Sequence, residues 1–577
     1  MTTPAILAAR VHYGLLSSIA LLGLLSLLLG MFETHLSWNR LNLASLVIVS
    51  ALGAGWKLRH KSKSLPRGNT SPGQPIPVAY FLSFLFASAA GLLFFSLDLI
   101  PSGLSGDPAR HFMGLIDPAE LVLAPIHKPI YYVIGGLFVH SFPWLEKDQL
   151  FVLFNIFVMG LSTGSSLLLF SHLFPSAKFL SLATTALWVS FGYSFFILQY
   201  GGYTLVLSSA FLFSAMALLV AQRDSLDKKA YGLVTLLALG VVLTHSYLVP
   251  DAMLVLLGFS LWNAQRLGRK FSSELWQRLP FWIGIAVVAV LSNLNFLGLE
   301  AFARVVVVQA YVNESFYLDV LPFLPLALAY VFLHRQTESA QLIFIFFLSA
   351  ALFSLYMLAL HSYGASTYYM NRNQIVLLPL LVMACVAMVQ AQEQSRPVVS
   401  NALYALAILC IGLPYVLVKN PPLTISEKKL KDLLDVNQLI YVQNVINTSL
   451  SPLQMTQKDR QLMSDMGAGR SDCMTGEKDQ HAALDTDLEV LWFEVYARAP
   501  IFRIQKNERA LLDKGFFNNY KEWLSDPNHT HVVVFKNFDL WGHPEILDDI
   551  KTQFSLVCQS DSIEVYRRPI KPSAAPA

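Results

Sequence analysis

One stretch decides the topology of this chain: Pro129-Ile-Tyr-Tyr-Val-Ile-Gly-Gly-Leu-Phe-Val-His-Ser-Phe-Pro-Trp-Leu145. It is apolar enough to enter a membrane, yet at the short end of what a spanning helix needs. On both sides of it, apolar stretches near the spanning length of about 20 residues recur from Val11 to Val418. A crossing at 129–145 would reverse the side of the membrane on which every later loop lies.

The composition of the 577 residues places most of the chain in lipid. Hydrophobic residues make up 54% and charged residues 14%, whereas a soluble protein carries about 25% charge. These values exclude a soluble enzyme, a disordered scaffold and a secreted disulfide module. The apolar run after Arg10 reaches Phe32 without a small-x-small cleavage site, so we interpret it as an uncleaved first span rather than a signal peptide.

The fold class expected is an α-helical polytopic membrane protein with about thirteen spans and a C-terminal soluble α/β domain. The segment 250–264 is short for a span. The predicted spans are 11–31, 41–56, 77–97, 149–170, 178–198, 203–221, 230–247, 250–264, 276–296, 317–333, 340–361, 374–391 and 402–418.

The distribution of Lys and Arg favours a model in which residues 129–145 do not cross. With a cytoplasmic N-terminus, 16 of these residues up to position 418 lie inside and 6 outside. A crossing at 129–145 would change the split to 9 inside and 13 outside, against the positive-inside rule. The sequence therefore predicts an interfacial helix at 129–145, a multi-pass protein of the cell inner (cytoplasmic) membrane, and an extracytoplasmic C-terminal region.

Three regions follow from this pattern. Residues 1–76 form two N-terminal spans and a basic cytoplasmic loop, and residues 77–418 form the main transmembrane domain. Residues 419–577 are richer in polar residues and contain β-like runs such as His531-Val-Val-Val-Phe535 and Ile563-Glu-Val-Tyr566, which predict a small extracytoplasmic α/β domain. Two of the four cysteines, Cys473 and Cys558, lie there; one disulfide or two separate buried thiols are both compatible with the sequence.

The first long outer loop contains the candidate catalytic acid. Asp107-Pro and Asp117-Pro both have the pattern of a helix N-cap followed by Pro at the first helical position. Asp107 is therefore either a cap or a carboxylate at the membrane surface that accepts a proton from an attacking hydroxyl. Arg110 and His111 follow on the first turn, and Asp98, at the end of the third span, is the second candidate acid.

Two further outer segments contain arginines. Arg372 stands directly above an apolar span, beside Tyr369 and Asn371, which with His245 are candidates for polar groups of a cavity. A guanidinium at headgroup depth either binds phosphate or anchors the helix at the interface. Arg304 lies four residues after Glu300, so that the two also fit a simple ion pair on one helix face.

Polar residues within the predicted spans are few. Asn155, His245, Asn293 and Asn295 are candidates for a cavity, with a helix–helix hydrogen bond as the ordinary alternative for each. The sequence contains no Walker A, HExxH, CxxC or clear Rossmann motif, and nothing in it supports nucleic-acid binding or ATP hydrolysis.

The layout resembles the GT-C membrane glycosyltransferases, which include protein O-mannosyltransferases and the lipid A aminoarabinose transferase. The resemblance lies in three features. These are the loop Gly106-Asp-Pro-Ala-Arg-His111, the interfacial segment from Lys128 that leads into a span near Leu150, and a soluble domain after the last span. The chain departs from the group in having two extra spans before the acidic loop and no paired Asp-Glu motif there.

The resemblance implies an inverting transfer of a sugar from a polyprenyl-phosphate donor to a glycan, lipid or protein hydroxyl, in contact with membrane lipid. Asp107 would then be the base, and Arg372 with Arg304 would bind the donor phosphate. No cofactor is required, although Asp107 and His111 have the spacing to hold a divalent metal ion. The alternatives are a lipid-linked oligosaccharide polymerase or ligase, a transporter or flippase for lipid-linked sugars, and a non-catalytic scaffold.

Overall fold

The computed structural model describes part of the chain, as two compact units. The first unit comprises Met1–Ile100 with Gly114–Ile425, and the second comprises Pro101–Met113 with Ser426–Ala577. The described residues are 4–31, 76–96, 111, 115, 129–142, 144–145, 147–193, 202–224, 228–291, 323–361, 368–393, 397–405, 458, 461–462, 481–483, 501–503, 531–535, 544–561 and 563–569.

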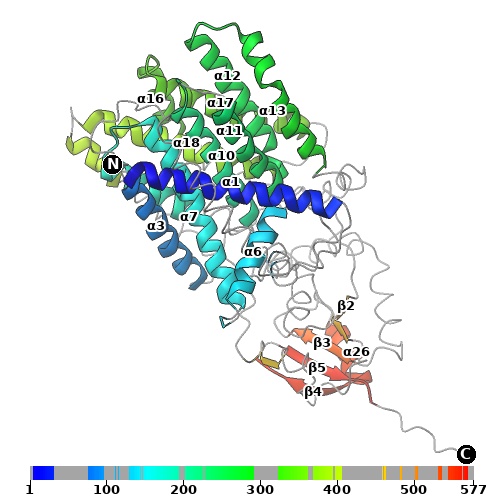
Figure 1. The fold of residues 1–577 in the computed structure, drawn as a ribbon. Coiled ribbons are helices and arrows are strands. Elements are labelled where there is room, and N and C mark those ends of the chain that lie inside the picture. The colour runs from blue at the N-terminus through cyan, green and yellow to red at the C-terminus, as the bar shows by residue number, and fades with distance from the viewer. Residues whose placement is uncertain are drawn as a thin grey trace, which may run out of the picture. The chain divides into compact units, whose positions relative to one another are not determined.

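The first unit is a bundle of helices (Figure 1). A π-helical segment, Trp188–Tyr193, continues α8, and a 3-10 turn, Ser246–Leu248, joins α11 to α12. The α-helices are α1 (Pro4–Met31), α3 (Ile76–Ser96), α6 (Pro129–Ser141), α7 (Lys147–Leu173), α8 (Phe179–Leu187), α10 (Tyr203–Ala221), α11 (Lys228–Thr244), α12 (Val249–Arg266), α13 (Phe271–Leu291), α16 (Leu324–Leu333), α17 (Glu338–His361) and α18 (Tyr368–Glu393).

Most predicted spans coincide with these helices. The predicted span 41–56 lies outside the described residues, as does all of 402–418 beyond residue 405. Among the residues that the structure describes, three helices have the length and composition to cross a membrane, namely Gln149–Leu173, Tyr203–Ala221 and Asn373–Gln392, and six more are apolar but shorter. The total of thirteen spans stays a prediction.

Helices α3 and α7 run antiparallel, which bears directly on the stretch 129–145. Gly164 packs near Ser83. Gly91, further along α3, packs against Ile156, which comes earlier in α7. An antiparallel pair requires an even number of crossings between the two helices. This direction agrees with a segment 129–145 that does not cross.

Helix α6 is short and buried against its neighbours. Its 13 residues make it about 20 Å long, less than the roughly 30 Å hydrocarbon core. Ile130 packs on Gly23 of α1, and the Tyr131 hydroxyl donates to Asn155 Oδ1 of α7 at 3.0 Å. Asn155 thus makes a helix–helix hydrogen bond, which was the alternative to a place in a cavity.

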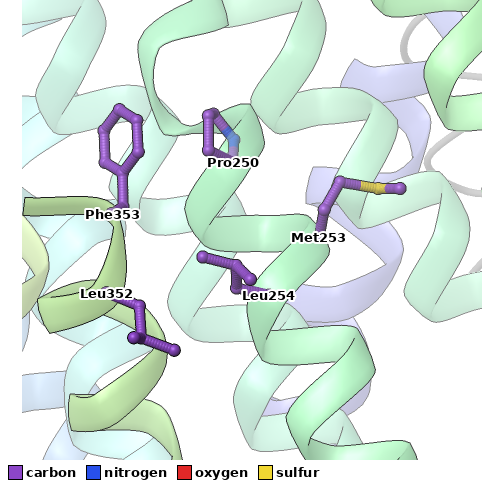
Figure 2. A pocket seen from close by; sticks show the side chains of 5 residues that line it. All are labelled: Pro250, Met253, Leu254, Leu352 and Phe353. Atoms are coloured by element: carbon purple, nitrogen blue, oxygen red, sulfur yellow. The ribbon is translucent and has the colours of Figure 1, made fainter. Parts of the chain in front are cut away.

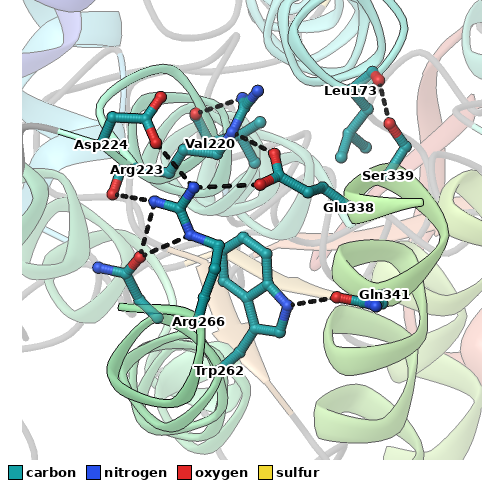
Figure 3. Close-up of polar contacts among 10 residues, drawn as sticks. Leu173, Val220, Arg223, Asp224, Trp262, Arg266, Glu338, Ser339 and Gln341 are labelled. Atoms are coloured by element: carbon teal, nitrogen blue, oxygen red, sulfur yellow. Dashed lines mark hydrogen bonds and ion pairs between the residues drawn. The ribbon is translucent and has the colours of Figure 1, made fainter. Parts of the chain in front are cut away.

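Ion pairs join three helix ends at one end of the bundle (Figure 3). Arg266, at the end of α12, donates to Asp224 Oδ1 at 2.7 Å and to Glu338 Oε1 at 3.1 Å. Arg223 Nε lies 2.8 Å from Glu338 Oε2. We call this the ion-pair end, defined by Arg223, Asp224, Arg266 and Glu338.

Further contacts bring more helix ends to the ion-pair end. The Ser339 hydroxyl donates to the carbonyl of Leu173 at 2.5 Å, which brings the end of α7 to the start of α17. Gln390, near the end of α18, donates to the carbonyl of Ser176 at 3.1 Å. The starts of α12 and α18 and the end of α17 therefore lie at the opposite end of the bundle, as the predicted alternation of loops requires.

The second unit contains a five-stranded mixed sheet in the order β2-β1-β3-β5-β4. Strands β1 (His481–Ala483), β2 (Ile501–Arg503) and β3 (His531–Phe535) are parallel, whereas β4 (Ser555–Gln559) and β5 (Ile563–Arg567) join antiparallel, with α26 (Pro544–Gln553) between β3 and β4. Two of these strands coincide with the β-like runs in the sequence. Burial raises the pKa of the Tyr566 hydroxyl, which also donates to Glu564 at 2.6 Å.

The cysteines differ in state. Cys385, in α18, is a buried free thiol, as expected for a small apolar group within a span. Cys558, in β4, is disulfide-bonded, and its partner lies outside the described residues. The pairing of Cys558 with Cys473 therefore stays a prediction.

The close contact of α10 with α11 provides a test of the packing. A Cβ atom on Gly240 would overlap the ring of Phe211, which is fully buried. We expect Gly240→Ala to lower the free energy of unfolding by about 1–3 kcal/mol, measured by thermal unfolding of the purified protein in detergent. Gly284→Ala is the matched control because its Cβ meets nothing within 4 Å; an equal loss in both variants would contradict this packing.

The disulfide can be tested by replacing each tail cysteine. Cys473→Ser and Cys558→Ser are each expected to abolish the shift in gel mobility that reductant causes in the folded protein, because either change removes one sulfur of the predicted bond. A shift that survives Cys473→Ser but not Cys558→Ser would give Cys558 another partner.

Candidate functional site

Several predicted site residues lie outside the part of the chain that the structure describes. The candidate acid and its neighbours are among them, so their roles stay predictions. These residues are Asp98, Asp107, Arg110, Asn293, Asn295 and Arg304. His111 is described: it belongs to the second unit, is buried and contacts other residues.

The predicted phosphate-binding arginine lies on the first turns of α18. Tyr369, Asn371 and Arg372 follow the first residue of this helix, and their side chains lie outside the described residues. Because α18 reaches the ion-pair end with Gln390, these three residues are at the opposite end. That is the end at which the sequence predicts the outer loops.

His245 lies at the same opposite end, directly after α11. Its side chain is buried, with 7% exposed, and its Nδ1 accepts a hydrogen bond from the backbone N–H of Tyr247 at 3.3 Å. The Tyr247 ring packs edge-on against Phe353 of α17, with 5.2 Å between ring centroids. His245 therefore supports the corner between α11 and α12, and the structure does not show it lining a cavity.

The structure adds a buried acid that sequence reasoning missed. Asp251, in the first turn of α12, is 0% exposed, and neither carboxylate oxygen has a hydrogen-bond partner. Asn373 of α18 is close enough to interact with it, though outside hydrogen-bond geometry. The only sign of this site in the sequence was the position of Asp251, which is the second residue of the predicted apolar span 250–264. Hydropathy alone indicates the edge of a loop there.

Two amides of α18 complete this polar cluster. Asn373 and Gln374 are both 0% exposed. Asn373 Nδ2 donates to the carbonyl of Ala350 in α17 at 2.7 Å, whereas neither Oε1 nor Nε2 of Gln374 has a partner. Polar groups buried without partners are rare in proteins and call for a ligand, a water or an ion.

An apolar cavity of about 370 Å³ lies between α12 and α17. Three of the residues that line it are close to Asp251 in the sequence of α12. Figure 2 shows the five side chains that line it, which carry no polar group. They are Pro250, Met253, Leu254, Leu352 and Phe353. A ligand with an apolar portion fits such a lining.

A second buried polar cluster lies nearer the ion-pair end. His12 Nε2 of α1 is 2.9 Å from Ser165 Oγ of α7 and 3.0 Å from Ser214 Oγ of α10. The Ser214 hydroxyl donates to Ser165 Oγ at 2.9 Å, and Ser165 donates to the carbonyl of Leu161 at 2.8 Å. These hydrogen bonds join α1, α7 and α10, so this cluster serves helix packing.

The structure is similar to the crystal structure of ArnT from Cupriavidus metallidurans in the apo state. The match covers 89% of this chain and 98% of that chain, with 12% sequence identity and a TM-score of 0.39. No protein-family model matches the sequence, and no curated protein matches it.

Among the described residues, no group of three or more His, Cys, Asp or Glu side chains is placed to hold a metal ion. Of the proposed metal-binding pair, His111 is described and Asp107 is not. The metal requirement therefore stays a prediction.

The assignment of the two bundle ends can be tested by labelling single cysteines. Lys270, just after α12, and Trp144, just before α7, are both exposed and lie at opposite ends. In a background free of other reactive thiols, a membrane-impermeant maleimide added to intact cells should label Trp144→Cys but not Lys270→Cys, because the positive-inside rule places Lys270 in the cytoplasm. Labelling of Lys270→Cys alone would reverse the topology.

Proposed function

We propose that this chain is a membrane glycosyltransferase of the GT-C type that transfers a sugar from a polyprenyl-phosphate donor to a hydroxyl acceptor. One observation carries the proposal: at the end opposite the ion pairs, an apolar cavity and a buried polar cluster lie on the same helices. A ligand with an apolar chain and a polar head fits this pairing. The acceptor is a glycan, a lipid or a protein.

Charges are expensive within a bilayer, and those found there are usually functional. Asp251 is such an ionisable residue, fully buried, and the first turns of α18, which carry Arg372, lie at the same end. This concentration of polar groups at one end supports a reaction site at the outer surface of the membrane. Helix packing alone does not require polar groups to be concentrated at one end of the bundle.

The chemistry follows from the residues that the sequence predicts for this surface. The acceptor oxygen attacks the anomeric carbon, the bond from that carbon to the phosphate oxygen breaks, and the configuration inverts. The Asp107 carboxylate takes the proton of the acceptor hydroxyl. Arg372, with Arg304, stabilises the charge that develops on the departing polyprenyl phosphate.

The remaining parts of the proposal follow the predicted topology. The protein lies in the inner membrane with the N-terminus in the cytoplasm, and the sheet-containing C-terminal region lies outside it. Phosphate is a sufficient leaving group without a metal ion, so no cofactor is required. Asp98 takes the place of Asp107 if the latter only caps a helix.

The proposal predicts that transfer depends on Asp107. Asp107→Asn at equal expression should lower sugar transfer from the active polyprenyl-phosphate donor by about 10²- to 10⁴-fold, because it removes the base. The assay uses isolated membranes and a panel of radiolabelled donors. Arg372→Ala should also reduce transfer, whereas Arg372→Lys should retain part of it because the positive charge remains.

Asp117→Asn is the matched control, because Asp117-Pro repeats the capping pattern in the same loop. Full activity in this variant and loss in Asp107→Asn supports catalysis. Equal activity in all three proteins would make Asp107 a helix cap and turn attention to Asp98. Absence of transfer from every donor would favour a polymerase, a ligase or a flippase.

A further inference from the structure

The carboxylate of Asp251 is the least explained polar group in the described bundle. It is 0% exposed, and neither Oδ1 nor Oδ2 has a hydrogen-bond partner. Its place in the first turn of α12 gives the charge some support from the helix dipole. This support is small compared with the cost of removing an ionised carboxylate from water without a partner.

The surroundings of Asp251 are held in place by three helices. The Ser349 hydroxyl of α17 shares its one proton between the carbonyl of Ile345 on the same helix, at 2.8 Å, and the carbonyl of Leu254 on α12, at 3.2 Å. One residue further along α17, the carbonyl of Ala350 accepts from Asn373 Nδ2 at 2.7 Å, joining α17 to α18. The Asn373 amide is thereby fixed close to the Asp251 carboxylate.

A fixed carboxylate beside a fixed amide can recognise hydroxyl groups. Two carboxylate oxygens offer about four acceptor positions, and an amide offers an acceptor and two donors. Neighbouring hydroxyls of a sugar supply several donors and acceptors within a few ångströms.

The apolar cavity lies at the first turns of α12, which also carry Asp251, although neither Asp251 nor Asn373 lines it. Pro250, Met253 and Leu254, which line the cavity, flank Asp251 on α12. An apolar chain in the cavity (Figure 2) would therefore bring its head group to the level of the first turn of α12.

We propose that Asp251, with Asn373, binds hydroxyl groups of the donor sugar and so determines which polyprenyl-phosphate sugar is accepted. This inference rests on the proposed function and deepens it. Asp251 is a specificity residue here, distinct from the base Asp107. Hydroxyl groups of the sugar would supply the hydrogen bonds that the Asp251 side chain lacks in the described bundle.

The experiment measures ligand-induced stabilisation of the full-length protein in detergent, with two probes. The probes are undecaprenyl phosphate and undecaprenyl-phosphate mannose, which differ by the sugar. The unmodified protein should bind the mannose lipid more tightly than the bare phosphate lipid. Asp251→Asn should weaken binding of the mannose lipid by about 10- to 100-fold and leave binding of the phosphate lipid unchanged. If mannose is not the sugar accepted, the transfer assay above supplies the correct lipid.

Stability of the variants without ligand separates this role from a structural one. An unpartnered buried carboxylate contributes no structural hydrogen bond, so Asp251→Asn should unfold at the same temperature as the unmodified protein or above it. A variant that unfolds at a lower temperature, or fails to fold, would overturn the proposal. Asn373→Leu should also weaken binding of the sugar lipid selectively, and normal binding in that variant would contradict the role of the amide.

Asp224→Asn is the matched control, because it makes the same chemical change at the ion-pair end, where Asp224 is 74% exposed. It should bind both lipids as the unmodified protein does. If Asp251→Asn keeps the full preference for the sugar lipid, the inference about Asp251 is wrong, whereas the proposed function stands. If the unmodified protein binds neither lipid, and no transfer is found with any donor, the proposed function fails with it.

Discussion

The antiparallel packing of α3 on α7 determines how the rest of the bundle is arranged. Small residues allow the close approach: Gly91 faces Ile156, Gly160 faces Phe84 and Gly164 faces Ser83. In lipid, helices associate through such close van der Waals contact and through hydrogen bonds, since burial of apolar side chains gives no advantage over contact with acyl chains. The direction of this pair then sets which loops share a side of the membrane.

Much of the fold could be predicted from the sequence because lipid imposes simple requirements. Each span must be apolar and close to 20 residues long, and Lys and Arg gather on one side. These requirements predicted α10 within its observed bounds and located α7, α12 and α17 to within a few residues. They also predicted two strands of the C-terminal sheet, where β-branched residues concentrate at His531–Phe535 and Ile563–Arg567.

The candidate site was harder to predict because its residues come together only in three dimensions. Asp251 and Asn373 are 122 positions apart (373 − 251) in the sequence and meet because α17 holds α12 and α18 together. Hydropathy treats Asp251 as the edge of a loop, although its side chain is fully buried. His12 escaped notice for the same reason, since the serines that bind it are on α7 and α10. Asp107 and Arg304 lie outside the described residues, so the sequence remains the basis for their roles.

The hydrogen bonds of His12 also constrain how the protein is made. Its partners Ser165 and Ser214 follow it by 153 and 202 residues. At about 5–20 residues per second, Ser214 is synthesised roughly 10–40 s after His12. During that interval the His12 imidazole of α1 is without its final partners. The hydrogen bonds that join α1 to α7 and α10 therefore form only after these two later helices have been made.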